Sequence, residues 1–286
     1  MHDLFYFTDV HGQLDLFQTM RDWCYKQDPE CIIVFGGDAC DRGKFGYDIM
    51  EAILNDPQMV YIRGNHEDMF LRAARELIAN NPDIKNKMLT IDEADELLVR
   101  ESWLHHVQLS LWNGGRPTLK NWLINGTSID FLQNLAEHTC YTLKADNGLC
   151  FSHTSGKQEI FDKVNEAEYN GELIDTDDIY EMIWERYSLM DWWDKDRTII
   201  FGHTPTQLID DYVPCKHMED DNVQPVAYRP HGNTGLHIAM DTGMNWSGRG
   251  YVLNCLTMQV YGFKDPNIID PTVRQPVIQF ENFKIK

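Results

Sequence analysis

The first seventy residues place carboxylate and imidazole side chains directly after short apolar segments. Asp9 and His11 follow the apolar residues 4–7, and Asp38 follows the apolar run 31–35. Short runs of β-branched and aromatic residues that end at a turn predict buried strands. Because residues two apart in an extended chain point to the same side, Asp9 and His11 offer a carboxylate and an imidazole together. A buried carboxylate is costly without a nearby cation, so the pattern favours a divalent metal at these strand ends.

The same pattern recurs along the chain, and the recurrence separates it from chance. Taken alone, the Gly-Asp segment at Asp38 would be an ordinary turn. Arg42 lies close enough in sequence to hold an anion that a metal at Asp38 also binds. Open α/β sheets bind ligands at the carboxyl ends of their strands. Ligand-type side chains also follow three later apolar runs: Asn65 and His66 after 59–62, His153 after 149–152, and His203 after 198–201.

The segments between these runs predict the elements that position them. Helical spacing of apolar residues predicts helices over 14–26, 47–54, 128–137 and 175–189, and two or three more between 69 and 108. We expect a hairpin of 140–143 with 149–152, a long loop over 210–235, and closing strands over 237–240 and 251–261. A tail from about 264 would wrap the surface and add an edge strand over 277–283. This order predicts a single domain, residues 1–286, in which two sheets pack together with helices outside.

Composition and charge exclude several classes of protein. The chain has 286 residues, 43% of them hydrophobic and 24% charged, which is an ordinary globular composition. A net charge of −20 opposes nucleic-acid binding, and the lack of an 18-residue apolar run opposes a membrane span. Seven scattered cysteines with no Cys-x-x-Cys pair, and an N-terminus without a positively charged leader, predict a cytoplasmic protein. We expect a monomer as the simplest state.

Five sequence blocks, taken in order, identify a family. They are Asp9-Val10-His11-Gly12, Gly37-Asp38-Ala39-Cys40-Asp41-Arg42-Gly43, Gly64-Asn65-His66-Glu67, His153 and Gly202-His203. Over residues 4–263 the chain resembles the metallophosphoesterase superfamily and, within it, the phosphoprotein phosphatase (PPP) type. Three further segments resemble its bacterial and bacteriophage branch, which includes lambda phosphatase: Asn113-Gly114-Gly115, Trp184-Glu185-Arg186 and Asp241-Thr242-Gly243.

The resemblance implies a centre with two divalent metal ions. One ion would be held by Asp9, His11 and Asp38, and the second by Asp38, Asn65, His153 and His203. Such ligands suit Mn²⁺ best, with Fe or Zn²⁺ as alternatives. A water between the two ions would become the hydroxide that attacks phosphorus directly.

The resemblance also implies roles for residues that do not bind metal. His66 would protonate the leaving oxygen as general acid, and Asp41 would orient it. Arg42 and Arg186 would hold the phosphoryl oxygens, with Asn65 and His66 completing the substrate site. Arg186 could instead be a surface arginine of the predicted helix 175–189.

The fold implied is an α/β (α+β) calcineurin-like β-sandwich of two mixed sheets flanked by helices, with a helical insertion. Insertions are expected near 76–106, 157–182 and 210–235, together with the tail from about 264. The second and third follow the strands that carry His153 and His203, so we expect them to rim the site and to shape substrate choice. Thr8 departs from the family pattern, which has glycine before the first aspartate, but no ligand position is lost.

The activity expected is hydrolysis of phosphoserine and phosphothreonine in proteins, or of small phosphoesters. Asp41 and Glu67 favour this over a symmetrical dinucleoside-polyphosphate (Ap4A-type) hydrolase, which is the nearest alternative. A broad phosphodiesterase acting on cyclic nucleotides or RNA ends is a further alternative. A binding scaffold without catalysis would have lost ligands, and here the ligands remain.

Overall fold

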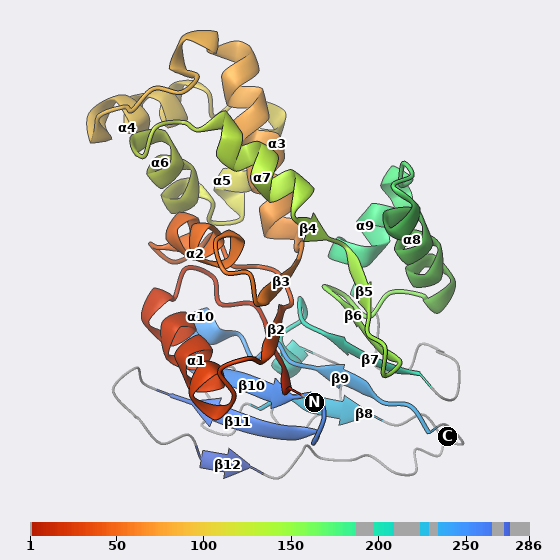
Figure 1. Cartoon of the computed structure of the whole chain (residues 1–286). Coiled ribbons are helices and arrows are strands. Elements are labelled where there is room, and N and C mark those ends of the chain that lie inside the picture. Colours follow the sequence, from red (N-terminus) through yellow and green to blue (C-terminus); the bar gives the residue numbers. More distant parts are fainter. Residues whose placement is uncertain (1, 187–196, 209–223, 229–233, 265–271, 275–286) are drawn as a thin grey trace.

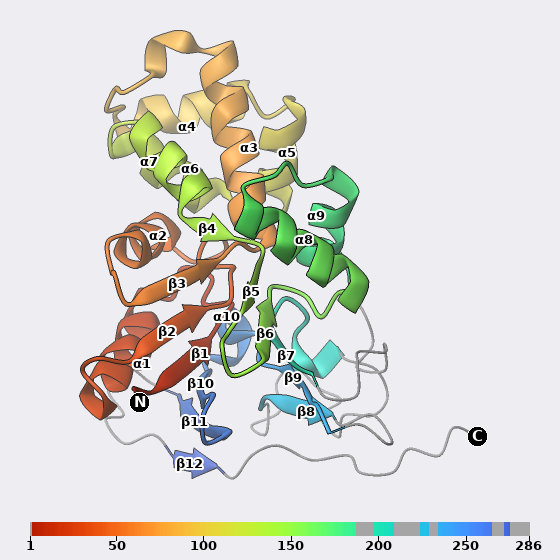
Figure 2. The ribbon, with the colours of Figure 1, turned by 45° about the vertical axis from the view of Figure 1, so that its right-hand side comes forward.

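Strands with alternating side chains build two mixed β-sheets that pack face to face (Figures 1 and 2). The computed structural model describes residues 2–186, 197–208, 224–228, 234–264 and 272–274. In the larger sheet the strand order is β12-β11-β10-β1-β2-β3-β4, and in the smaller it is β5-β6-β7-β9-β8. The predicted sandwich of two mixed sheets flanked by helices is therefore confirmed.

The larger sheet is parallel on one side and antiparallel on the other. Its parallel strands are β1 (Leu4–Phe7), β2 (Ile32–Phe35), β3 (Met59–Ile62) and β4 (Thr139–Cys140). Its antiparallel strands are β10 (Gly250–Asn254), β11 (Gln259–Phe263) and β12 (Thr272–Arg274).

The smaller sheet has a parallel centre and two antiparallel edges. The central strands are β6 (Leu149–Ser152), β7 (Thr198–Phe201) and β9 (His237–Ala239), and the edges are β5 (Thr142–Lys144) and β8 (Val226–Tyr228). The parallel strands of the two sheets carry all the predicted ligand residues at their carboxyl ends.

Successive side chains of a strand point to opposite faces, and this alternation decides which residues lie between the sheets and which lie under the helices. In β1, Phe5 and Phe7 face the outer helices while Tyr6 faces the space between the sheets. In β7, Ile200 faces the same space while its neighbours Ile199 and Phe201 face outward. Each strand therefore contributes to two apolar cores, one between the sheets and one beneath the helices.

Helices cover the outer faces of both sheets. Over the larger sheet lie α1 (Leu14–Gln27) and α2 (Gly46–Leu54), and next to them a helical cap. The cap contains α3 (Asn65–Asn80), η1 (Pro82–Ile84), α4 (Ile91–Arg100), α5 (His105–Trp112), α6 (Arg116–Ile124) and α7 (Ile129–Glu137). Over the smaller sheet lie α8 (Gln158–Asn170) and α9 (Thr176–Trp184), and the connections include η2 (Thr206–Leu208) and α10 (Met244–Ser247).

The predicted hairpin of 140–143 with 149–152 is wrong in its first strand. That segment divides at Tyr141, so that β4 joins the larger sheet and β5 the smaller one. The carboxylate of Glu168 on α8 accepts the N–H groups of Tyr141 and Thr142 at 2.6 and 3.0 Å. This side chain satisfies the backbone where the chain crosses from one sheet to the other.

Three further predictions need correction or fall outside the described residues. The helix expected over 175–189 ends at Trp184, and residues 187–189 are not described. The loop expected over 210–235 contains strand β8, while most of its remaining residues are not described. The edge strand expected over 277–283 is also outside the described residues, and β12 forms the edge next to β11.

The insertion expected near 76–106 contains α4 and η1, and that near 157–182 contains α8 and most of α9. Within the described part of the chain, no helix is both long and apolar enough to span a bilayer.

Candidate metal centre

The loops that leave β1, β2, β3, β6 and β7 bring most of the predicted ligands together, and His66 joins them where Asp9 was expected. Two groups of side chains offer ligand atoms that lie within 4.8 Å of one another. One contains His11, Asp38 and His66, and the other contains Asp38, His153 and His203, and every member is buried. Asp38 belongs to both groups, as expected for a carboxylate shared by two ions.

The two oxygens of Asp38 face different imidazoles. Its Oδ2 lies 3.6 Å from Nε2 of His11, and its Oδ1 lies 3.3 Å from Nε2 of His153. On the second side the Asn65 Oδ1 lies 3.1 Å from Nε2 of His153 and 3.1 Å from Nδ1 of His203. One carboxylate thus reaches both halves of the site, and Asn65 joins the second half.

Each of three imidazoles uses its outer nitrogen to bind a backbone carbonyl. Nδ1 of His11 lies 3.0 Å from the Cys40 oxygen, and Nδ1 of His153 lies 2.8 Å from the Gly36 oxygen. Nε2 of His203 lies 3.0 Å from the Trp184 oxygen. If these nitrogens donate, the other ring nitrogen is a lone-pair donor that faces the centre, which is the arrangement typical of metal-binding histidines. Carboxylate, imidazole and amide donors together fit divalent transition metals.

The backbone around the centre is held in a conformation that L-residues seldom adopt. Positive φ values of 55°, 43°, 58° and 65° occur at Asp9, His11, Asp38 and His203. Aspartate and histidine adopt such values more often than most residues other than glycine, but the values still cost free energy and persist where the surroundings hold them. They mark the ligand loops as segments whose shape serves the site.

The carboxylate of Glu67 ties two of these loops to each other. It accepts the N–H groups of Asp38 at 2.9 Å, of Ala39 at 2.8 Å and of Gly64 at 2.8 Å. A Cβ at Gly64 would lie 2.2 Å from Oδ1 of Asp38, so only glycine permits this approach. Sequence analysis used Glu67 only to distinguish families. The signal for its structural role was its place three residues after Gly64, where a glutamate can cap the first turn of α3.

The electrostatics of the centre keep its shared carboxylate ionised. Burial alone would raise the pKa of Asp38, but the nearby imidazoles, His153 first and then His66, hold it well below its usual range. Against the effect of burial, the carboxylate of Asp38 raises the pKa of His153 to about 10. Burial lowers the pKa of His203, and the positive charges of His153 and Arg186 lower it further. The anionic carboxylate attracts cations, and a metal ion bound at His153 would replace the proton that the carboxylate otherwise holds on its imidazole.

His66 is paired with Asp41 at the edge of the first group. Its Nδ1 lies 2.8 Å from Oδ2 of Asp41, and both side chains are buried. The Arg42 guanidinium lies between the rings, 2.7 Å from Nε2 of His11 and 3.1 Å from Nε2 of His66. The structure therefore brings His66, Asp41 and Arg42 together beside Asp38.

Asp9 and Arg186 are not members of the two groups of ligand atoms. The Asp9 carboxylate accepts the backbone N–H of His203 at 3.2 and 3.1 Å and the Thr8 hydroxyl at 2.6 Å, and it belongs to neither group of ligand atoms. Its contacts join the loops after β1 and β7. Arg186 is exposed and lies beyond the end of α9, not within a helix as predicted. Its influence on the pKa of His203 places its charge near the second group.

Sequence analysis missed the contacts that hold Arg42. The half-exposed indole of Trp246 on α10 lies under the guanidinium, 5.6 Å from ring centroid to Cζ. The backbone N–H of Arg42 donates to the carbonyl of Gly114 at 2.9 Å. The turn before α10 is fixed by buried Asp241, whose carboxylate accepts the Gly243 N–H at 2.7 Å. The sequence shows Gly114 and Asp241 only as parts of motifs.

Comparison with known proteins supports the assignment of the fold. Residues 4–233 match the family model described as calcineurin-like phosphoesterase. The solved structure of a cold-active protein tyrosine phosphatase is 15% identical, with a TM-score of 0.50 over 96% of this chain and 78% of that chain. No curated protein matches the chain in sequence.

Two other solved structures are similar at lower TM-scores. One is a metallophosphoesterase from Sphaerobacter thermophilus, 12% identical with a TM-score of 0.48, which covers 92% of this chain and 87% of that chain. The other is a protein serine/threonine phosphatase from Saccharomyces cerevisiae, 14% identical with a TM-score of 0.42, which covers 100% of this chain and 82% of that chain.

Replacing Glu67 tests whether the link between the two loops supports metal binding. In Glu67→Gln an amide group would face a backbone N–H, and at least one buried donor would lose its partner. We expect the free energy of unfolding to fall by about 2 kcal/mol and the affinity for Mn²⁺ to fall with it, measured by denaturant titration and by metal titration. Glu51→Gln, at an exposed position on α2, is the matched control. An unchanged metal affinity would show that the ligand loops hold their positions without this carboxylate.

Replacing Trp246 tests whether its ring positions Arg42. A cation–π contact at a partly exposed site contributes about 0.5–1 kcal/mol, so Trp246→Ala should weaken the binding of inorganic phosphate, in the presence of Mn²⁺, about two- to fivefold. Trp246→Phe should retain most of the affinity because it keeps an aromatic face. Trp103→Ala, at another exposed tryptophan, serves as control. Equal affinity in the alanine and phenylalanine variants would argue against this role.

Proposed function

The chain belongs to the calcineurin-like phosphoesterase family, and from this premise we propose that it hydrolyses phosphoserine and phosphothreonine in proteins. Family membership implies a hydrolase that acts on phosphoesters and uses a dinuclear metal site. Our proposal adds that the substrates are phosphomonoesters in proteins. It also assigns the chain to the PPP type and its bacterial and bacteriophage branch.

The buried His66–Asp41 pair beside Asp38 is the observation that carries the proposal. A monoester leaves as an alkoxide, which needs a proton. Nε2 of His66 lies on the side of Asp38, 3.8 Å from its Oδ2, and Nη2 of Arg42 lies 3.1 Å from the same nitrogen. Burial would lower the pKa of His66, but the carboxylates of Asp38 and Asp41 outweigh burial and raise it. Once Arg42 binds the phosphoryl group and no longer donates to Nε2, His66 can hold a proton there, while Asp41 accepts from the proton-bearing Nδ1 and fixes the ring.

Two ions would be held by the predicted ligands: Asp9, His11 and Asp38 on one side, and Asp38, Asn65, His153 and His203 on the other. The donor set described above fits Mn²⁺, with Fe or Zn²⁺ as alternatives. When bound, two such ions acidify a water and neutralise the charge of the phosphoryl group.

The cationic side chains of this chain would bind the substrate. Arg42 offers planar donors next to His66, so it can hold phosphoryl oxygens while the leaving oxygen faces Nε2 of His66. Arg186 lies on the side of His203 and would bind the remaining phosphoryl oxygen. Both cations would stabilise the negative charge that develops during transfer.

The setting of the enzyme is part of the same proposal. All six cysteines in the described part of the chain are free thiols, which supports a reducing, cytoplasmic environment. The net charge of −20 supports protein or small phosphoester substrates over nucleic acid, and we propose a monomer.

A comparison of substrates tests the proposed activity. With Mn²⁺ added, we expect fast phosphate release from a phosphoserine peptide and from p-nitrophenyl phosphate, and slow cleavage of diadenosine tetraphosphate. A chelator should abolish all turnover because it removes both ions. Asp38→Asn should do the same because the shared carboxylate holds both ions. Fast cleavage of the dinucleotide with a slow peptide would move the protein to the dinucleoside-polyphosphate hydrolases.

The variant His66→Asn tests the proposed role of the histidine. Because His66 would donate a proton and not bind metal, the variant should keep both ions while turnover falls about 10²–10⁴-fold. Metal content is measured by elemental analysis and turnover with the phosphoserine peptide. His138→Asn, at an exposed histidine at the end of α7, should change neither. Loss of metal from His66→Asn would instead identify this residue as a ligand.

A further inference from the structure

Thr8 contacts a carboxylate that the proposed centre uses for its first ion. Thr8 is 4% exposed, and its hydroxyl lies 2.6 Å from Oδ2 of Asp9, while the Gly37 carbonyl is more distant at 3.3 Å. A hydroxyl has one proton to donate, so the shorter contact takes it. At a position where the resemblance described above implies glycine, this chain therefore adds a hydrogen bond to a predicted ligand.

The two oxygens of Asp9 differ in what they accept. Oδ2 accepts the Thr8 hydroxyl and, at 3.1 Å, the backbone N–H of His203. Among the residues that the structure describes, Oδ1 accepts only that same N–H, at 3.2 Å. Because each carboxylate oxygen offers about two lone pairs, Oδ2 has a donor for each of them, and Oδ1 keeps one lone pair for a further partner.

Two glycines, one in a loop of each sheet, hold Thr8 and Asp9 in this arrangement. A Cβ at Gly202, after β7, would lie 2.1 Å from Oδ2 of Asp9 and 2.7 Å from the Thr8 hydroxyl oxygen. A Cβ at Gly36, after β2, would lie 2.7 Å from the same hydroxyl oxygen and 2.0 Å from that of Tyr6. The backbone of both loops lies directly against the Thr8 hydroxyl, which has little room to turn away from the carboxylate.

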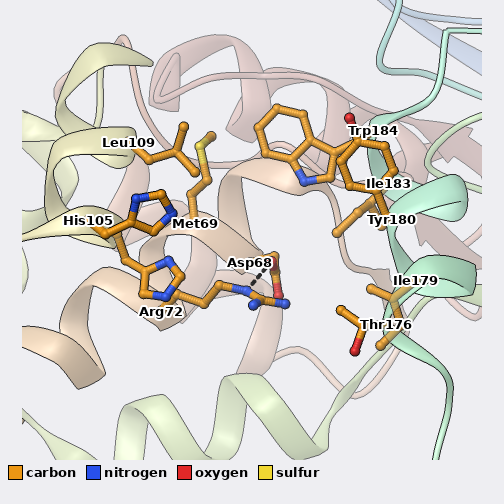
Figure 3. Close-up of a pocket in the computed structure, with 11 residues that line it drawn as sticks. Asp68, Met69, Arg72, His105, Leu109, Thr176, Ile179, Tyr180, Ile183 and Trp184 are labelled. Carbon is orange, nitrogen blue, oxygen red and sulfur yellow. Dashed lines mark hydrogen bonds and ion pairs between the residues drawn. The ribbon is translucent and has the colours of Figure 1, made fainter.

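The second group of ligand atoms has supports that do not involve Thr8. Nε2 of His203 lies 3.0 Å from the carbonyl oxygen of Trp184, the last residue of α9, whose indole lines a cavity between α3, α5 and α9 (Figure 3). Nδ1 of His153 lies 2.8 Å from the Gly36 carbonyl oxygen. Loss of the Thr8 hydroxyl should therefore change the Asp9 side of the centre and leave the second group in place.

We propose that Thr8 is a positioning residue for the first ion. By occupying Oδ2 of Asp9, its hydroxyl restricts the carboxylate to binding that ion through Oδ1 alone, together with His11 and Asp38. This inference rests on the proposed function, and within it on Asp9 as a ligand of the first ion. Groups that hydrogen-bond to metal ligands orient them, and their removal typically weakens metal binding about 10- to 100-fold.

Calorimetric titration of the metal-free chain with Mn²⁺ tests the proposal without reference to activity. Thr8→Val keeps the shape of the side chain but removes its hydroxyl. In this variant we expect the first ion to bind about 10- to 100-fold more weakly and the second ion to bind as in the unsubstituted protein. Thr8→Ser keeps the hydroxyl and should retain both affinities. His11→Asn and His203→Asn mark which binding step belongs to which ion.

Thr127→Val is the matched control. Thr127 is also buried, and its hydroxyl donates to the Lys87 carbonyl at 2.8 Å within the helical cap. Loss of this hydrogen bond should lower the stability of the fold without changing either metal affinity. Thr8→Ala removes the hydroxyl and places no methyl group beside Asp9, so it should behave as Thr8→Val and provides the test if that variant does not fold.

The outcomes separate this inference from the proposed function. Equal weakening of both ions in Thr8→Val, or a loss in Thr8→Ser as large as in Thr8→Val, would show that Thr8 only supports the fold and would overturn the inference. Tighter binding of the first ion in Thr8→Val would show that the hydroxyl competes with the metal, which also overturns it. Selective weakening of the first ion, with no hydrolysis of the phosphoserine peptide by the unsubstituted protein, would support the inference and overturn the proposed function. Peptide hydrolysis with both affinities unchanged in Thr8→Val would do the reverse.

Discussion

Three backbone N–H groups from two separate loops converge on one buried carboxylate, that of Glu67. The loop after β2 carries Asp38 and the loop after β3 carries Asn65, so their relative position sets the distance between ligands on the two sides of the centre. The left-handed backbone of Asp38 is unfavourable by itself and needs surroundings that enforce it. Without the carboxylate, three buried donors would lack partners, and the loops could separate.

The sequence was sufficient where a structural feature depends on a local pattern. The short apolar runs 4–7 and 31–35 predicted buried strands, and the residues that follow these strands lie close together. His11, Asp38, His153 and His203 assemble because parallel strands end at the same edge of each sheet. For the same reason the pairing of His66 with Asp41 follows from the adjacent order of β2 and β3.

The sequence was insufficient where a distant side chain decides the structure. The division of the chain at Tyr141 depends on Glu168, which belongs to a helix that the apolar pattern did not predict. The contact of Arg42 with Trp246 joins opposite ends of the chain, and no local pattern reports it. Helix α9 ends at Trp184, where the backbone becomes extended and the Trp184 carbonyl contacts His203, and this contact also lies outside any local signal.

The candidate metal ligands come from both sheets, and this arrangement affects how the protein reaches its native state. His153 binds the Gly36 carbonyl across 117 residues of sequence, and the His203 N–H binds Asp9 across 194. Contacts of such long range form slowly, because loop closure must precede any gain from them. The ligand set is therefore complete only once the two sheets have closed on each other. Ions bound there would stabilise the state in which the two sheets are packed together. The supply of metal ions in the cell would therefore influence how long each newly made molecule stays folded before it is degraded.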